Sequence, residues 1–109
     1  MKYEVELRSS HLLLSPTLSN LMMKESNSVY VAYKEENKTL LVTPKENSWF
    51  PKLHQSQEFM LKSKDLKGTK SISIREILID HDLDDLDRKL SCTVHDGKKF
   101  MKIDFANPA

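Results

Sequence analysis

The sequence of 109 residues contains a single cysteine, Cys92. One cysteine excludes an intramolecular disulfide and a zinc site built from several thiolates, and it is typical of a reducing compartment. Long apolar runs are also missing, so the sequence predicts no transmembrane helix. The opening stretch Met1–Glu6 lacks the apolar core of a secretory signal. Together these absences predict a cytoplasmic protein with no membrane partner.

Glycine is nearly as scarce, with two residues in the chain. No glycine-rich phosphate loop, serine-centred elbow or pair of glutamates at catalytic spacing is present. The acidic segment Asp80–Asp87 invites comparison with a calcium loop. That motif requires glycine at its sixth position and glutamate at its twelfth, where Asp85 and Ser91 stand. The histidines occur at no spacing typical of metal ligands: His11, His54, His81 and His95. We therefore predict a protein that is not an enzyme, with no metal, no cofactor and no small-molecule substrate.

Charge of one sign is not in excess, because the net charge is +1. Its distribution along the chain is nevertheless uneven. The stretch Lys45–Arg75 has seven lysines and arginines against three acids, whereas Glu76–Asp96 has seven acids against two basic residues. A net charge near zero does not decide for or against nucleic acid, but a local basic stretch can bind it.

Short β-strands dominate the pattern that is present. Tyr3–Leu7 alternates polar and apolar residues, as a half-buried strand does. In Leu90–Val94 the same alternation puts Cys92 on the apolar face, where a free cysteine is typical of a core. Asp96–Gly97 is typical of a type I′ turn, and Ala106–Ala109 is expected to be a tail. We predict strands over 3–7, 12–14, 29–33, 39–43, 59–61, 71–74, 90–94 and 98–105, with 45–67 as an irregular linker.

Two short helices are expected between these strands. Ser15 is a suitable N-cap, Pro16 suits the first helical position, and the spacing of Leu18, Leu21 and Met22 gives one apolar face. A second helix can begin at Arg75, although its branched apolar residues would equally allow the preceding strand to continue. The fold class predicted is mainly β with short helices (α+β), in a single domain over residues 1–109.

The order of the expected elements repeats along the chain. Shifting the sequence by about sixty residues aligns Leu12–Leu14 with Ile72–Ile74, and Leu18 with Leu78. The pseudo-repeats cover about 8–44 and 68–105, and each has the order strand, helix, strand, strand. Chance similarity between short strands is the alternative explanation.

This βαββ order, together with the stretch Ser10–Leu21, resembles the swapped-hairpin family of AbrB-type and MraZ-type bacterial proteins. In that family an apolar strand leads into a helix opened by proline, and then into a valine-rich strand such as Val29–Val31. The chain departs from the pattern at Asn27-Ser28, where the family usually has Gly-Asp. The resemblance implies a swapped-hairpin-like barrel formed by the two halves, DNA binding through basic residues at loops and strand ends, intertwined homodimers, and a role in transcription regulation.

The basic stretch supplies the candidate site. We predict that duplex DNA is bound by Lys62, Lys64, Lys67, Lys70 and Arg75, with Arg8 and His11 extending the patch if the halves pack as the resemblance implies. A lysine-rich loop that only keeps the chain soluble is the alternative. A second hypothesis is a protein-interaction or assembly module, with Asp80–Asp87 and the Trp49–Phe50 loop as contacts.

Overall fold

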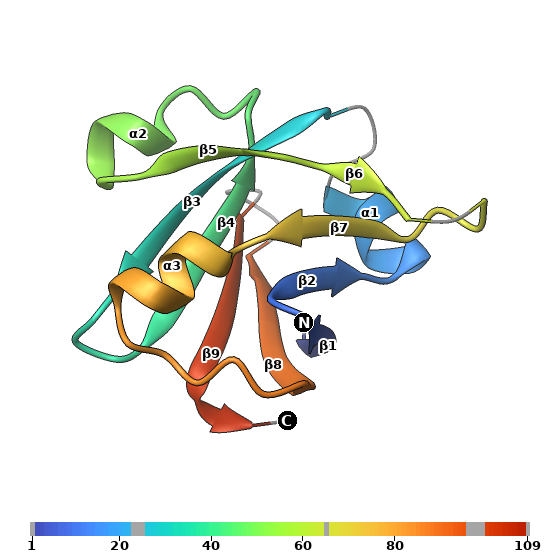
Figure 1. Cartoon of the computed structure of the whole chain (residues 1–109). Helices are drawn as coiled ribbons and strands as arrows, with labels where there is room; N and C mark the ends of the chain where they lie inside the picture. The colour runs from blue at the N-terminus through green and yellow to red at the C-terminus, as the bar shows by residue number, and fades with distance from the viewer. Residues whose placement is uncertain (1, 23–25, 65, 96–99, 109) are drawn as a thin grey trace.

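The chain folds into one antiparallel sheet that curves into a nearly closed barrel (Figure 1). A computed structural model describes residues 2–22, 26–64, 66–95 and 100–108. The strands are β1 (Lys2–Arg8), β2 (His11–Leu14), β3 (Ser28–Lys34), β4 (Thr39–Pro44), β5 (Gln57–Met60), β6 (Lys62–Ser63), β7 (Lys70–Ser73), β8 (Arg88–His95) and β9 (Phe100–Pro108). The helices are α1 (Pro16–Met22), α2 (Phe50–Leu53) and α3 (Arg75–Asp80). The prediction of a mainly β fold with short helices is confirmed.

The barrel closes through two strands that follow each other in the chain. The strand order is β5-β3-β4-β9-β8-β1-β2-β7-β6, so β5 and β6 stand at the two edges of the sheet. Only Leu61 separates them, and its amide donates a hydrogen bond to the Asn27 carbonyl at 2.9 Å. In Figure 1 the two strands run as one line across the top of the barrel. The chain therefore changes partner at Leu61, from β3 on one edge to β7 on the other.

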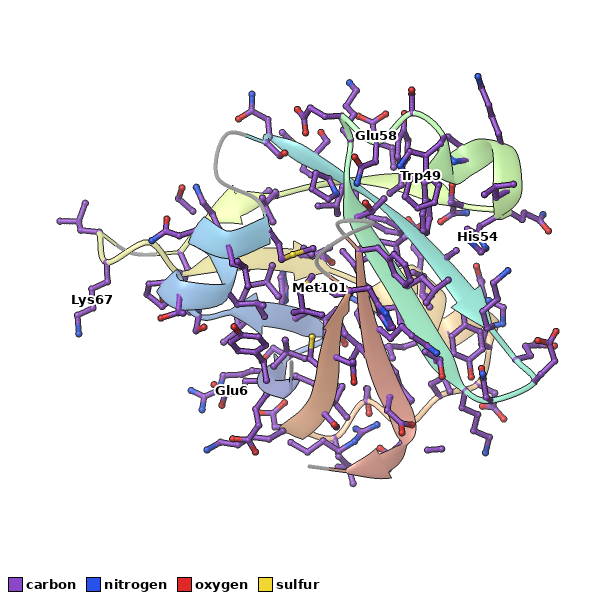
Figure 2. All side chains as sticks on the ribbon, turned by 180° about the vertical axis from the view of Figure 1, so that it is seen from behind. Glu6, Trp49, His54, Glu58, Lys67 and Met101 are labelled. Carbon is purple, nitrogen blue, oxygen red and sulfur yellow. The ribbon has the colours of Figure 1, made fainter. Side chains whose placement is uncertain are left out.

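The barrel interior is filled by the inward-facing side chains of alternating strand positions. Leu7, Leu14 and Ile103 are fully buried, and Met101 lies in the middle of the barrel (Figure 2). The expected inner face of β8 is confirmed, because its three apolar side chains are all in this core: Leu90, Cys92 and Val94. Period-two alternation thus predicts which side chains fill the barrel.

Helix α1 begins as the sequence predicts. The Ser15 hydroxyl accepts a hydrogen bond from the Leu18 amide at 3.2 Å, which satisfies one of the free donors of the first turn. Leu18 and Met22 are buried as expected. Leu21 was expected on the same face, but it is exposed, and Ser19 takes the buried position by donating a hydrogen bond to the Leu14 carbonyl.

The segment 45–67 was expected to be irregular apart from a strand over 59–61. It contains that strand as β5, and in addition α2 and β6, so the expectation of an irregular linker is wrong in part. Helix α2 packs on the outer face of the sheet, where Phe50 is fully buried against Ala32 and Leu41. Trp49 borders the same cluster and contacts the Phe100 ring edge-on at 6.5 Å between ring centres. The Trp49–Phe50 pair therefore forms a small second core outside the barrel.

One other expectation about the second half needs correction. Ala106–Ala109 was expected to be a tail, but β9 continues to Pro108, which pairs with Leu90 beyond a bulge. The acidic stretch is helical only as far as Asp80, and residues 83–87 have no regular structure. Helix α3 does begin at Arg75, so the helical alternative there is the right one. The Asp96–Gly97 turn lies outside the described residues.

Candidate nucleic-acid interface

Four of the predicted lysines lie on one hairpin. We call residues 62–64 and 66–70 the basic hairpin. In it Lys62 pairs with Ser71, Ser63 pairs with Lys70, and the Lys64 amide donates a hydrogen bond to the Thr69 carbonyl at 2.8 Å. The loop beyond β6 and β7 extends away from the barrel (Figure 1), and Lys67 lies at its outer end (Figure 2). Backbone pairing therefore places these lysines together at a projecting edge of the molecule.

The side chains of the basic hairpin face solvent. Lys62, Lys64 and Lys67 are exposed, while Lys70 is half-buried and donates a hydrogen bond from Nζ to the Ser63 hydroxyl at 2.9 Å. Exposed lysines of this kind can contact phosphates. Leu66 lies between Lys64 and Lys67 and is fully exposed.

The base of the basic hairpin rests on α1. Gly68 has a φ of 103°, a left-handed conformation that glycine adopts at least cost. A Cβ atom built there would lie 3.6 Å from the Cβ of Pro16. The first residue of α1 supports the loop from below.

Arg8 pairs with His11, at the end of β1 that is away from the basic hairpin. A groove of about 460 Å³ is lined by Arg8, Lys64 and Lys89, but also by Glu4 and Glu6. Arg8 forms an exposed ion pair with Glu6. Arg8 therefore shares this groove with Lys64 but does not belong to the basic hairpin, and two glutamates offset its charge.

His11 and Arg75 lie at the other end of β7. His11 pairs with Ser73, whereas Leu14 pairs with Lys70, so the antiparallel register separates the histidine from the basic hairpin. His11 Nδ1 lies 2.8 Å from the Ser9 carbonyl oxygen. Arg75 lines a depression of about 430 Å³ in acidic surroundings that include Asp82 and Asp85. The seven predicted residues therefore form no single patch.

The acidic segment is partly used by the fold itself. The Asp87 carboxylate accepts a hydrogen bond from the Ser9 amide at 2.9 Å, and so ties the segment to the β1–β2 turn. Asp84 accepts a hydrogen bond from the Leu86 amide at 2.9 Å. The acidic segment stands beside the end of β7 that is opposite to the basic hairpin.

A cavity of about 620 Å³ between β3, α3 and residues 55–57 was not expected from the sequence. In its wall the rings of Tyr33 and His81 lie 4.4 Å apart, and His81 Nδ1 lies 3.2 Å from Glu35 Oε1. Burial, together with the negative charge of Glu35, raises the pKa of the Tyr33 hydroxyl. The Ser56 hydroxyl is buried there without a hydrogen-bond partner among the described residues. His81 is 46 residues from Glu35, so no local motif could have signalled the contact.

The thiol of Cys92 is buried in the barrel, and burial raises its pKa to about 12. A thiol in this state is neutral at physiological pH and unreactive. Within the described part of the chain, no three His, Cys, Asp or Glu side chains gather where they could hold one metal ion. Among the same residues, no helix is long and apolar enough to cross a membrane.

Comparison with known proteins gives no match to a protein-family model, to a curated protein or to a solved structure. The resemblance to the swapped-hairpin family therefore stays a prediction from the sequence.

Proposed function

We propose that this protein is a non-enzymatic module that binds nucleic acid, with duplex DNA as its partner and the basic hairpin as its contact surface. The observation that carries the proposal is the clustering of Lys62, Lys64, Lys67 and Lys70 on one projecting hairpin. A two-stranded β-ribbon can enter the major or the minor groove of duplex DNA. Lysines on such a ribbon can contact the phosphates on either side.

The charge distribution supports a defined orientation on DNA. The lysines of the basic hairpin stand at the Lys70 end of β7. Asp82 and Asp85 lie near Arg75, at the opposite end of β7. Phosphates attract the first end and repel the second, so the hairpin would approach the duplex first. Regulation of transcription is the role that fits the family resemblance.

We further propose that the barrel consists of two swapped-hairpin halves, β1 to β4 and β5 to β9. Leu12 pairs with Ile72 and Leu41 pairs with Lys102, at sequence distances of 60 and 61 residues. If the sequence repeats about every sixty residues, the two members of each pair occupy equivalent positions in the two halves. Equivalent residues pair with each other where a two-fold axis relates the halves. The β3–β4 hairpin also stands between β5 and β9, both from the second half.

The proposed repeat includes one strand more in each half than the sequence indicates. β1 pairs with β2 of its own half and β8 of the other, and the β5–β6 strand pairs in the same way with β7 and β3. The connections differ, because β1 and β2 are joined by a two-residue turn at Ser9-Ser10, whereas β6 and β7 are joined by residues 64–69. The basic hairpin is thus an extension without a counterpart in the first half.

The alternative function is a protein-interaction or assembly module that uses the Trp49–Phe50 loop and the acidic segment. Phe50 is fully buried, whereas Trp49 packs in the same cluster and stays partly exposed. The acidic segment remains exposed at Asp84 and Asp85. A stable oligomer in light scattering, combined with no affinity for DNA, would favour this alternative.

A fluorescence anisotropy titration with labelled duplex DNA tests the proposed function. If all four lysines contact phosphates, affinity should fall on the order of a hundredfold between about 50 mM and about 200 mM salt, because each contact releases counterions. Binding that is absent even at the lower salt concentration would show that the proposal is wrong.

A further inference from the structure

We infer that Leu66 is a wedge, inserted between neighbouring base pairs when the basic hairpin enters a groove of duplex DNA, so that the DNA is bent. This inference rests on the proposed function and adds a mode of recognition to it. Apolar side chains that partly unstack a base step are a general means by which proteins in the minor groove bend DNA.

The exposure of Leu66 is the first observation behind this inference. Its relative exposure is 107%, whereas the next most exposed large apolar side chain among the described residues, Leu53, reaches 72%. Lys67, which follows Leu66, and Lys64, two positions before it, are exposed as well. Asp65 stands between Lys64 and Leu66 in the sequence. An apolar side chain with this exposure is available for a partner. The lysines beside it would bring that side chain to a phosphate backbone.

The support beneath the loop is the second observation. The Lys64 amide donates to the Thr69 carbonyl at 2.8 Å and closes the loop at its base. Gly68 packs next to Pro16, so α1 supports the loop from the barrel side. A wedge must keep its position while it separates stacked bases, and a loop with a closed and supported base can do so.

The surroundings of Leu66 favour DNA over two other partners. Insertion of one leucine would give the protein little affinity for a membrane, since even a whole myristoyl chain gives only marginal membrane binding. A protein partner would bury Leu66 among several lysines, a residue type depleted in the centre of protein interfaces. A base step needs only one inserted side chain, and its phosphates match the lysines.

The experiment compares the wild type with Leu66→Ala on two duplexes, one fully paired and one with a central mismatch. A mismatched step is already partly unstacked, so a protein that inserts a wedge binds it more tightly. We expect the wild type to prefer the mismatched duplex about tenfold or more, and Leu66→Ala to lose that preference. Energy transfer between dyes at the duplex ends should report bending by the wild type and a straighter duplex with Leu66→Ala.

Leu53→Ala is the matched control, because Leu53 is also an exposed leucine but lies on α2, and it should behave as the wild type. If the wild type and Leu66→Ala bind both duplexes alike and bend neither, the wedge is wrong and DNA binding stands. If the wild type binds neither duplex, the proposed function itself fails. Binding of the wild type, but not of Leu66→Ala, to vesicles of mixed neutral and anionic lipids, without DNA bending, would also overturn the wedge.

Discussion

At the scale of single residues, burial changes the protonation of side chains that no motif singles out. The ring of His54 packs against the buried ring of Phe50 at 4.8 Å between ring centres and is tilted by 40°, and its Nδ1 is buried without a hydrogen-bond partner among the described residues. The pKa of His54 is lowered below the ordinary value of 6.5. Desolvation by burial is the larger cause, and the positive charge of Lys34 is the smaller one. The folded protein therefore prefers His54 in its neutral form.

This preference predicts a pH dependence of stability. As the pH falls through about 6.5, the unfolded chain binds a proton at His54 that the folded protein does not. Stability should therefore fall between about pH 7.5 and about pH 5.5, and His54→Gln should lose less stability over that range than the wild type. Urea unfolding of both proteins at the two pH values measures the difference. The other histidines are present in both proteins, so their contributions cancel in the difference between the two stability losses. Equal losses in the two proteins would contradict the assigned effect of burial.

At the scale of elements, the hairpins and the inner faces of the strands could be predicted because they depend on local alternation. β3 and β4 are close in sequence, and Leu90, Cys92 and Val94 recur with a period of two. Strand β5 could not be placed as well, because most of its side chains are exposed and Met60 is an exposed apolar residue within it. Its position depends on pairing with β3, which is a long-range contact without a local signal.

The junction of β5 and β6 gives the prediction at this scale. Leu61 is buried in the barrel core where the chain changes from one sheet edge to the other. Leu61→Ala should lower the free energy of unfolding by about 2–4 kcal/mol, since it removes buried apolar surface and leaves a cavity. Leu53→Ala, an exposed leucine on α2, should change it by less than about 0.5 kcal/mol. Urea denaturation measures both variants, and equal effects would show that Leu61 does not stabilise the closure.

At the scale of the whole molecule, the candidate site was predictable only where its residues are close in sequence. Lys62, Lys64, Lys67 and Lys70 share one hairpin, so their proximity follows from a local turn. His11 and Arg75 depend on the β2–β7 register, which separates both from that hairpin. The charge distribution along the sequence therefore indicated one basic and one acidic region of the molecule. The strand register between β2 and β7 determines which of the predicted residues lie in each region.

The central claim is that the basic hairpin contacts DNA phosphates, and the salt dependence of binding tests it most directly. With four lysines engaged, the logarithm of the affinity should fall with the logarithm of the salt concentration with a slope of about −3 to −4. The double variant Lys64→Ala/Lys67→Ala should reduce the steepness by about 2. Lys45→Ala/Lys52→Ala removes the same charge from exposed positions outside the hairpin and should leave the slope unchanged. Equal slopes for the two double variants would contradict the account, because net charge alone would then explain binding.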